Sequence, residues 1–281
     1  AGIAGDFTIT KLDDEDFLMI GSGIAERYHQ RFFNMVARDG GVSFESFTEA
    51  WGGFNVAGPS ARKLLAQLTD ADLSNAGFPF LRSRKIRVAG LDAVVIRVSF
   101  TGDLGWEIYV PLEHQRALYE ALLEKGGPLG AKPVGGRALL SLRVEKGYGS
   151  WSREYSPEYW PQEVGLERLI KLDKPEFLGR EAYLAIKDKP PREKLVVARV
   201  ETTNADANGG EPVFLPDGTP VGRVSSGAFG HSVGASIALC FIRTDHAVAG
   251  TELDIAILGI PHRAVILEKP PFDAGGERLR A

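Results

Sequence analysis

Several features that mark other classes of protein are missing from this chain. It has one cysteine, Cys240, which cannot form an internal disulfide, so we expect a reducing compartment. No apolar run approaches the roughly 20 residues of a membrane-spanning helix, so we expect no membrane partner. Basic residues are not in excess, because 33 Lys and Arg stand against 37 Asp and Glu, and this argues against nucleic-acid binding. The first ten residues carry no basic leader and do not resemble a signal peptide. We therefore expect a cytoplasmic protein, or a protein of the mitochondrial matrix if the source is eukaryotic.

Metal-ligand spacing is also missing. The five histidines are scattered along the chain, and neither HExxH nor C-x-x-C occurs. The acidic run Asp13–Asp16 lies among turn-forming residues and is interpreted as a solvated turn. No metal site is predicted.

The first segment lacks Met and already alternates like a strand from Ile3 to Ile9. A domain that opens inside a strand suggests that residues precede it. We therefore expect a fragment or a processed subunit, with Met removal from a natural start as the alternative.

The 281 residues suffice for two domains, and the pattern of elements changes near Pro190. Before that point helices and strands interleave, with predicted elements at Phe17–Ile20, Ile24–Ala37, Val42–Val56, a helix capped by Ser60, a hairpin within Lys85–Phe100, Gly105–Val110, Pro111–Glu124 and Gly135–Lys146. After it only strands are expected, at Leu195–Val200, Pro212–Leu215, Val221–Val224, Ile237–Ile242, Leu253–Leu258 and Arg263–Leu267. The sequence predicts an α+β core over residues 1–190 and an all-β barrel or sandwich over 191–281.

Two short motif matches have simpler explanations. The segment Gly21–Glu26 resembles a dinucleotide fingerprint, but Glu26 replaces its third glycine and would place a negative charge near a pyrophosphate. We interpret it as a tight turn between a strand and a helix. The segment Gly230–Gly234 matches the nucleophile elbow G-x-S-x-G, which needs a helix after Ser232. Because a β-rich segment follows, a glycine-rich loop between two barrel strands is favoured over a serine hydrolase.

Two carboxylates stand in apolar surroundings. Asp6 interrupts an apolar segment, and a carboxylate there is costly to bury without a partner. Glu145 ends a helix whose other face is apolar, and aromatic residues follow it. Glu145 could simply pair with Arg143 or Lys146, or it could bind a ligand.

Five motifs in the same order resemble the aminomethyltransferase, or glycine cleavage T-protein, family. The matching segments are Gly2–Ile9, Ser99–Val110, Leu142–Gly147, Pro161–Leu166 with Lys171–Ala182, and Gly222–Gly227 with Gly234–Leu239. The segments Glu145–Tyr155 and Pro271–Arg280 are most similar to the C-terminal folate-binding part of dimethylglycine and sarcosine dehydrogenase-like flavoproteins. The resemblance implies an N-terminally incomplete T-protein-like α+β core, followed by a C-terminal β-barrel.

The resemblance also implies a cofactor and a site. Tetrahydrofolate would bind Glu145, which matches the family's pterin-binding glutamate, while Asp6 matches its catalytic aspartate. Trp151 and Tyr148 would pack on the pterin or its linker, and Lys174 stands where the family has a basic residue. FAD would belong only to an upstream domain or subunit that is missing here.

The resemblance implies a one-carbon transfer module of an N-demethylating flavoenzyme. Its partners would be folate and a one-carbon unit derived from a methylated amine. The alternatives are a free-standing aminomethyltransferase of the glycine cleavage type and a non-catalytic folate-fold binding module.

Overall fold

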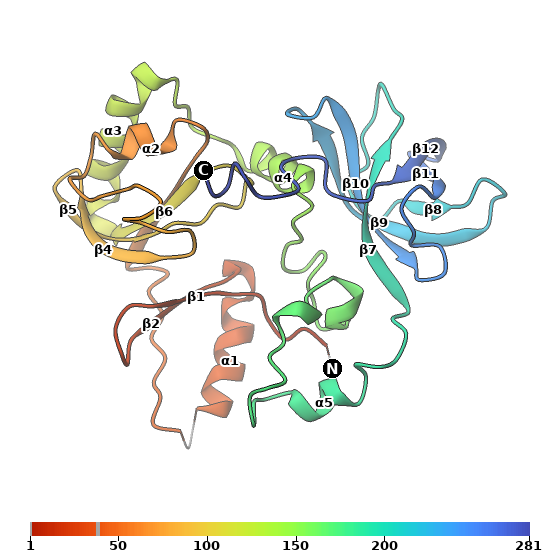
Figure 1. Ribbon diagram of the computed structural model, residues 1–281, viewed down its shortest axis with the longest axis horizontal. Helices are drawn as coiled ribbons and strands as arrows, with labels where there is room; N and C mark the ends of the chain where they lie inside the picture. The colour runs from red at the N-terminus through yellow and green to blue at the C-terminus, as the bar shows by residue number, and fades with distance from the viewer. Residues whose placement is uncertain (1, 38–39) are drawn as a thin grey trace. The chain divides into compact units, whose positions relative to one another are not determined.

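The computed structural model describes residues 2–37 and 40–281, and their contacts divide the chain into two compact units (Figure 1). The barrel unit comprises Ala1–Asp6 and Gly136–Ala274, and the sheet unit comprises Phe7–Gly135 and Gly275–Ala281. The barrel unit contains all of the predicted site residues, which are Asp6, Glu145, Tyr148, Trp151 and Lys174. The division into domains 1–190 and 191–281 follows strand content rather than contacts and stays a prediction.

The sheet unit contains a four-stranded antiparallel sheet in the order β3-β6-β5-β4. Its strands are β3 (Trp51–Ala57), β4 (Ser83–Val88), β5 (Leu91–Ile96) and β6 (Gly105–Pro111). Helices α2 (Ala61–Leu65) and α3 (Gln115–Gly126) bury apolar side chains against one face of this sheet, where Trp106, Ile108 and Leu118 are fully buried. The same unit contains a hairpin of β1 (Thr8–Lys11) and β2 (Phe17–Ile20), and helix α1 (Glu26–Val36) after the 3₁₀ turn η1 (Gly23–Ala25).

Short 3₁₀ turns flank the remaining helices. These are η2 (Leu112–His114), η3 (Gly127–Leu129), η4 (Pro161–Glu163) and η5 (Glu167–Leu169), and a short helix α5 (Arg180–Leu184) follows the last of them. Within residues 2–37 and 40–281, no helix combines the length and the apolar character that crossing a membrane requires.

The barrel unit contains a closed barrel in the order β10-β7-β12-β11-β8-β9, which confirms the predicted C-terminal β-barrel (Figure 1, teal to blue). Its strands are β7 (Glu193–Val200), β8 (Pro212–Phe214), β9 (Pro220–Gly230), β10 (Ala235–Arg243), β11 (Glu252–Ile257) and β12 (Ile260–Ile266). With the helices and sheet described above, the fold is α+β, as predicted.

Strand β10 is buried on both of its faces, from Ser236 to Ile242. Alternate side chains such as Ala238 and Ile242 fill the barrel. The opposite side chains, Ile237 and Leu239, pack outside it against Val144 of helix α4 (Gly136–Glu145). Because strand side chains alternate between faces, this arrangement fixes α4 against the outer wall of the barrel.

Two local predictions were wrong. No strand covers Ile3–Ile9 before Thr8, because the backbone N–H of Ile3 donates to Tyr159 O at 3.1 Å and its side chain joins a separate apolar cluster. Only Trp51–Ala57 of the predicted strand Val42–Val56 is extended, because Ala50 and Trp51 both donate to Phe47 O and close a turn. Ser60 is the N-cap residue of α2, as predicted, although its side chain forms no capping hydrogen bond. The predicted helix Ile24–Ala37 ends one residue later than α1, whose last residue is Val36. Residues 38 and 39 lie outside the described residues.

Candidate functional site

Glu145 is the last residue of α4, and its side chain is fully buried. Its Oε1 accepts a hydrogen bond from the backbone N–H of Ser232 at 2.8 Å. Its Oε2 has no hydrogen-bond partner among the described residues. Since buried carboxylate oxygens are normally satisfied, this oxygen is an acceptor available to a ligand.

The alternative in which Glu145 pairs with a neighbouring cation is wrong. Arg143 forms a buried ion pair with Glu154, at 2.9 Å from Nη1 to Oε2. Lys146 forms a buried ion pair with Asp273, at 3.1 Å from Nζ to Oδ2. Both cations next to Glu145 in the sequence are therefore engaged by other carboxylates.

The turn between β9 and β10 lies directly against the Glu145 side chain. A Cβ atom added to Gly230 would stand 2.9 Å from Glu145 Cγ and 3.0 Å from its Oε1, so only glycine leaves room for the carboxylate. One helical turn before Glu145, on the same face of α4, Ser141 Oγ donates to Phe229 O at 2.6 Å. The G-x-S-x-G match is thus a turn between barrel strands, as predicted, and Ser232 contributes its backbone N–H to the site.

A buried polar network supports the loop that follows Glu145. Glu154 accepts hydrogen bonds from Arg143, from Ser226 Oγ at 2.6 Å and from the backbone N–H of Ser150 at 3.0 Å. Arg143 also donates to Ser226 Oγ at 2.6 Å and to Tyr148 O at 3.0 Å. Burial lowers the pKa of the Arg143 guanidinium, and the Glu154 carboxylate opposes that shift. The network therefore joins α4, the loop over residues 148–154 and barrel strand β9.

The two predicted aromatic residues lie on this supported loop. Tyr148 is half-buried, and Lys146 Nζ lies 5.9 Å from the centre of its ring. Trp151 is half-buried, forms a bridge with Tyr155 and packs against the apolar cluster that contains Ile3. Both rings therefore lie on one anchored loop, three and six residues after Glu145 in the sequence.

Asp6 lies near the same loop. The N-terminal segment is held there because Ile3 bonds to Tyr159 O and because Gly2 packs on the backbone of Pro157 with no space for a side chain. Asp6 is exposed, yet the surrounding chain removes part of its hydration and so raises its pKa. Burial also raises the pKa of the Tyr155 phenol, and the Asp6 carboxylate adds to that rise. This electrostatic effect identifies Tyr155, which sequence reasoning did not assign, as a neighbour of Asp6.

Lys174 is not brought into this arrangement by any contact. It is exposed on a turn after η5, and its ammonium forms no hydrogen bond or ion pair with the residues that the structure describes. Its role as a folate-binding residue stays a prediction.

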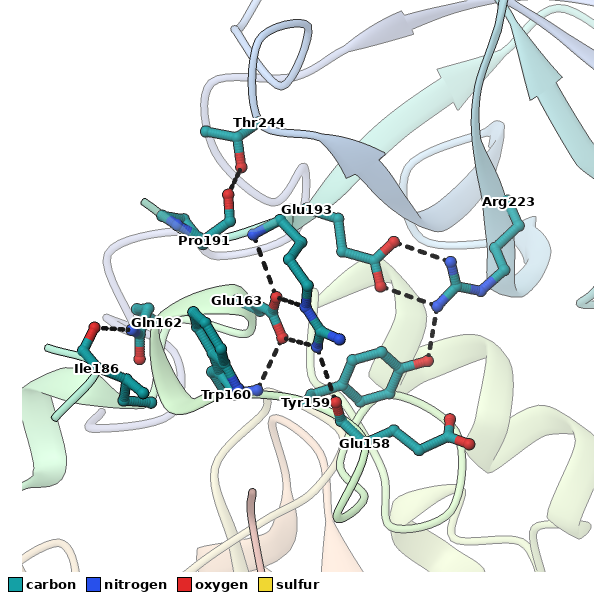
Figure 2. Close-up of polar contacts among 11 residues, drawn as sticks. Glu158, Tyr159, Trp160, Gln162, Glu163, Ile186, Pro191, Glu193, Arg223 and Thr244 are labelled. Atoms are coloured by element: carbon teal, nitrogen blue, oxygen red, sulfur yellow. Dashed lines mark hydrogen bonds and ion pairs between the residues drawn. The ribbon is translucent and has the colours of Figure 1, made fainter. Parts of the chain in front are cut away.

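The segment that follows this loop is held to the start of the barrel by Glu163 (Figure 2). Glu163 accepts from Arg192 Nε at 2.7 Å and from the backbone N–H of Trp160 at 2.8 Å. Burial alone would raise the pKa of Glu163, but these donors outweigh it and hold the pKa below its ordinary value. Figure 2 also shows Arg223 between Glu193 and the hydroxyl of Tyr159. The Arg223 guanidinium donates to the two carboxylate oxygens of Glu193 at 2.8 and 2.9 Å. Glu163, the glutamate of the family-like segment Pro161–Leu166, therefore has a structural role in this protein.

Three contributors to the site had no clear signal in the sequence. Glu154 and Ser226 lie 11 and 83 residues from Arg143, so only the fold brings them together. Ser232 acts through its backbone, which no side-chain pattern reveals. No group of three or more potential metal ligands gathers in the part of the chain that the structure describes.

Comparison with known proteins defines the class to which this arrangement belongs. The GCVT N-terminal domain matches residues 1–174, and the glycine cleavage T-protein C-terminal barrel domain matches residues 194–273. The chain therefore belongs to the glycine cleavage T-protein family.

Relatives of two kinds fall within this family. The chain is 33% identical to human mitochondrial dimethylglycine dehydrogenase over 95% of its own length and 31% of that protein. It is 32% identical to 4-methylaminobutanoate oxidase (formaldehyde-forming) of Paenarthrobacter nicotinovorans, over 100% of the chain and 34% of the relative. It is 31% identical to an aminomethyltransferase of Caldanaerobacter subterraneus, over 95% of the chain and 71% of the relative. The chain thus spans about a third of the length of the dehydrogenase and oxidase relatives.

A solved structure supports the same fold. The glycine cleavage system aminomethyltransferase T of Bartonella henselae superposes with a TM-score of 0.84 at 25% identity, over 98% of this chain and 73% of that one. The chain is therefore related both to free-standing aminomethyltransferases and to dehydrogenases in which the family fold is one part of a longer protein.

Proposed function

We propose that this chain is a tetrahydrofolate-binding one-carbon transfer module of an N-demethylating flavoenzyme similar to dimethylglycine dehydrogenase. The observation that carries the proposal is the buried Oε2 of Glu145, which has no hydrogen-bond partner among the described residues. The pterin ring of folate presents an amino group and a ring N–H side by side. A carboxylate accepts from both, and such charge-assisted hydrogen bonds are stronger than neutral ones.

The environment of Glu145 suits that task. The Ser232 N–H fixes Oε1, and the Glu145 side chain lies close against Gly230, so Oε2 has a defined position. The Arg143–Glu154 pair anchors the loop of Tyr148 and Trp151, whose rings would pack on the pterin or its linker. A preorganised acceptor binds without first losing the freedom of a mobile side chain.

Asp6 is proposed as the catalytic residue. Tetrahydrofolate supplies the two amines that take up a one-carbon unit from formaldehyde or an iminium donor. The Asp6 carboxylate would orient these amines and stabilise the positive charge that develops as the new C–N bonds form. Its raised pKa places it closer to the range in which a carboxylate can accept and return a proton. Lys174 would neutralise negative charge on the folate, which its exposed position permits.

Relatives support this choice of enzyme without deciding it. The dehydrogenase and oxidase relatives act on N-methylated compounds by their names, and a flavin in another part of such an enzyme would deliver the one-carbon unit. The second candidate is a free-standing aminomethyltransferase, favoured by the similarity to enzymes of that name. A third reading is a folate-fold module that binds without catalysis.

Calorimetric titration of the chain with tetrahydrofolate tests the proposal. We expect saturable binding at one site. Absence of binding by a folded chain would reject the function. If folate binds, formation of methylene-tetrahydrofolate with an aminomethylated lipoyl carrier protein as the donor, and release of ammonia and the carrier thiol, would favour the free-standing aminomethyltransferase. Failure with that carrier, and product formation when formaldehyde is delivered by an amine oxidase, would favour the demethylating module.

A further inference from the structure

The sheet unit contains a second candidate site, which the one-carbon transfer does not use. A cavity of about 760 Å³ opens on the face of the four-stranded sheet opposite α2 and α3. Its walls include the aromatic rings of Phe17, Phe47, Trp51 and Tyr109, and its lining is mainly apolar. This volume lies within the range of about 300–1,000 Å³ that small-molecule sites occupy.

The strand register explains why the sheet is open at this place. Lys85, Val94, Tyr109 and Gly53 stand opposite one another on β4, β5, β6 and β3, so they share one face. Gly53 provides no side chain there, and the ring of Tyr109 lies over it, since an added Cβ would meet Tyr109 Cε1 at 2.8 Å. This row of residues therefore forms an apolar surface, the floor of the cavity, with the cation Lys85 at its end.

The polar end of Tyr109 is already satisfied. Its hydroxyl donates to Glu107 Oε2 at 2.7 Å, which leaves the ring as an apolar wall. The rings of Phe47 and Trp51 form a second wall, with their centroids 5.6 Å apart and a tilt of 46°. Ser83 Oγ donates to Lys11 O at 3.5 Å and ties the β1–β2 hairpin, which bears Phe17, to the edge of the sheet. Flat ring systems suit such a lining, because aromatic side chains pack favourably against rings.

The charged residues that border the cavity indicate which flat ligands it would favour. Lys85 lies on edge strand β4, and its ammonium forms no hydrogen bond or ion pair with any described residue. Arg87 also borders the cavity, but its guanidinium donates to Gly90 O, and its Nε lies 3.9 Å from Asp92 Oδ1. Asp16 borders the cavity from the exposed end of the hairpin, outside the row that contains Lys85. Lys85 is therefore the cation best placed to meet an anionic group above the apolar floor.

We propose that this cavity binds a small aromatic organic anion, with its rings between Trp51 and Tyr109 and its anionic group on Lys85. The site lies wholly within the sheet unit and is independent of the Glu145 site. It would give the protein a ligand in addition to folate.

Two fluorescent probes with the same rings test the proposal. The first is the anion 8-anilinonaphthalene-1-sulfonate, and the second is uncharged N-phenyl-1-naphthylamine. Both are titrated against the full chain and against Lys85→Gln, Asp16→Asn and Lys63→Gln, with circular dichroism as a check on folding. Lys63 is the matched control, because it is an exposed lysine on α2 that does not border the cavity.

We expect saturable binding of the anionic probe by the folded parent. Lys85→Gln should weaken it about three- to fivefold, the range of a partly exposed ion pair, and leave the uncharged probe within twofold. Asp16→Asn should strengthen binding of the anion, and Lys63→Gln should change neither probe. The proposal is overturned if the folded parent does not bind the anion saturably, if Lys85→Gln affects both probes equally, or if Lys63→Gln weakens the anion as much as Lys85→Gln does.

Discussion

The Arg143–Glu154 pair gives the sharpest stability prediction. Both side chains are almost completely buried, at 1% and 0% exposure, and Glu154 accepts from three donors. Glu154→Ala would leave the buried Arg143 guanidinium without its carboxylate partner. Such a change typically lowers the free energy of unfolding by about 3–5 kcal/mol. In a unit of this size that loss corresponds to a fall in melting temperature of about 10 °C. Glu158 is the matched control, because its exposed side chain lies only four residues after Glu154, and Glu158→Ala should stay within about 0.5 kcal/mol of the parent.

Urea unfolding at constant temperature measures this difference. The combined change Arg143→Met with Glu154→Leu should recover much of the loss, because removing both charges avoids an isolated one. Glu154→Ala should also weaken folate binding in the folded protein, since the loop of Tyr148 and Trp151 loses its anchor. A midpoint for Glu154→Ala that matches Glu158→Ala would show that the pair does not hold the loop, and the reasoning would be refuted.

Further predictions concern the carboxylates and the turn. Asp6→Asn should slow product formation sharply and leave folate affinity within a few-fold, because the charge acts on the reaction rather than on binding. The fold raises the pKa of Asp6 above 3.8, so the folded protein binds the Asp6 proton more tightly than the unfolded chain does, and the parent loses stability as pH rises above that value. Asp6→Asn should therefore unfold at a higher temperature than the parent at pH 7. This gain should vanish below pH 3.8, where the carboxyl is protonated in both states. Since the pKa of Glu163 is lowered below 4.5, its ion pair adds stability above that pH and loses it in acid; Arg192→Ala should be destabilising at pH 7 and nearly neutral at the acid end of a pH series of melts. Gly230→Ala should displace the Glu145 carboxylate and weaken tetrahydrofolate binding in a titration, and an unchanged affinity would remove the turn from the site.

The barrel could be predicted from the sequence because each strand has a short apolar run between turn signals. All six predicted strand segments after Pro190 correspond to strands β7 to β12. The predicted range Val221–Val224 was too short, because β9 continues to Gly230 through serine and glycine residues that have low strand propensity. Pairing with β10 keeps that end extended.

The N-terminal elements were harder to predict, because tertiary contacts rather than the local sequence pattern determine the backbone conformation there. The alternation from Ile3 to Ile9 was genuine, but Ile3 packs with Tyr159 and Phe241 rather than into a strand next to β1. The apolar residues of Val42–Val56 likewise do not form one strand, since Phe47 closes a turn in the middle. A period-two pattern does not distinguish a strand from a coil that buries alternate side chains.

The candidate site was predictable only in part for a related reason. The apolar surroundings of Glu145 drew attention to it, but two cations adjacent in sequence made a simple ion pair equally consistent with the pattern. Arg143 and Lys146 bond to Glu154 and Asp273, which lie 11 and 127 residues away from them. The free oxygen of Glu145 depends on these distant partners, so only the structure reveals it.

Glu145 Oε2 is the proposed acceptor for folate, and one comparison of variants tests this role most directly. Tetrahydrofolate is titrated against the parent, Glu145→Gln and the exposed control Glu252→Gln, with folding checked by thermal unfolding. In Glu145→Gln the amide oxygen can still accept from the Ser232 N–H, but an NH₂ donor replaces Oε2. Affinity should therefore fall about ten- to a hundredfold, or roughly 1.5–3 kcal/mol, while Glu252→Gln matches the parent. Equal affinity in all three folded proteins would contradict the account.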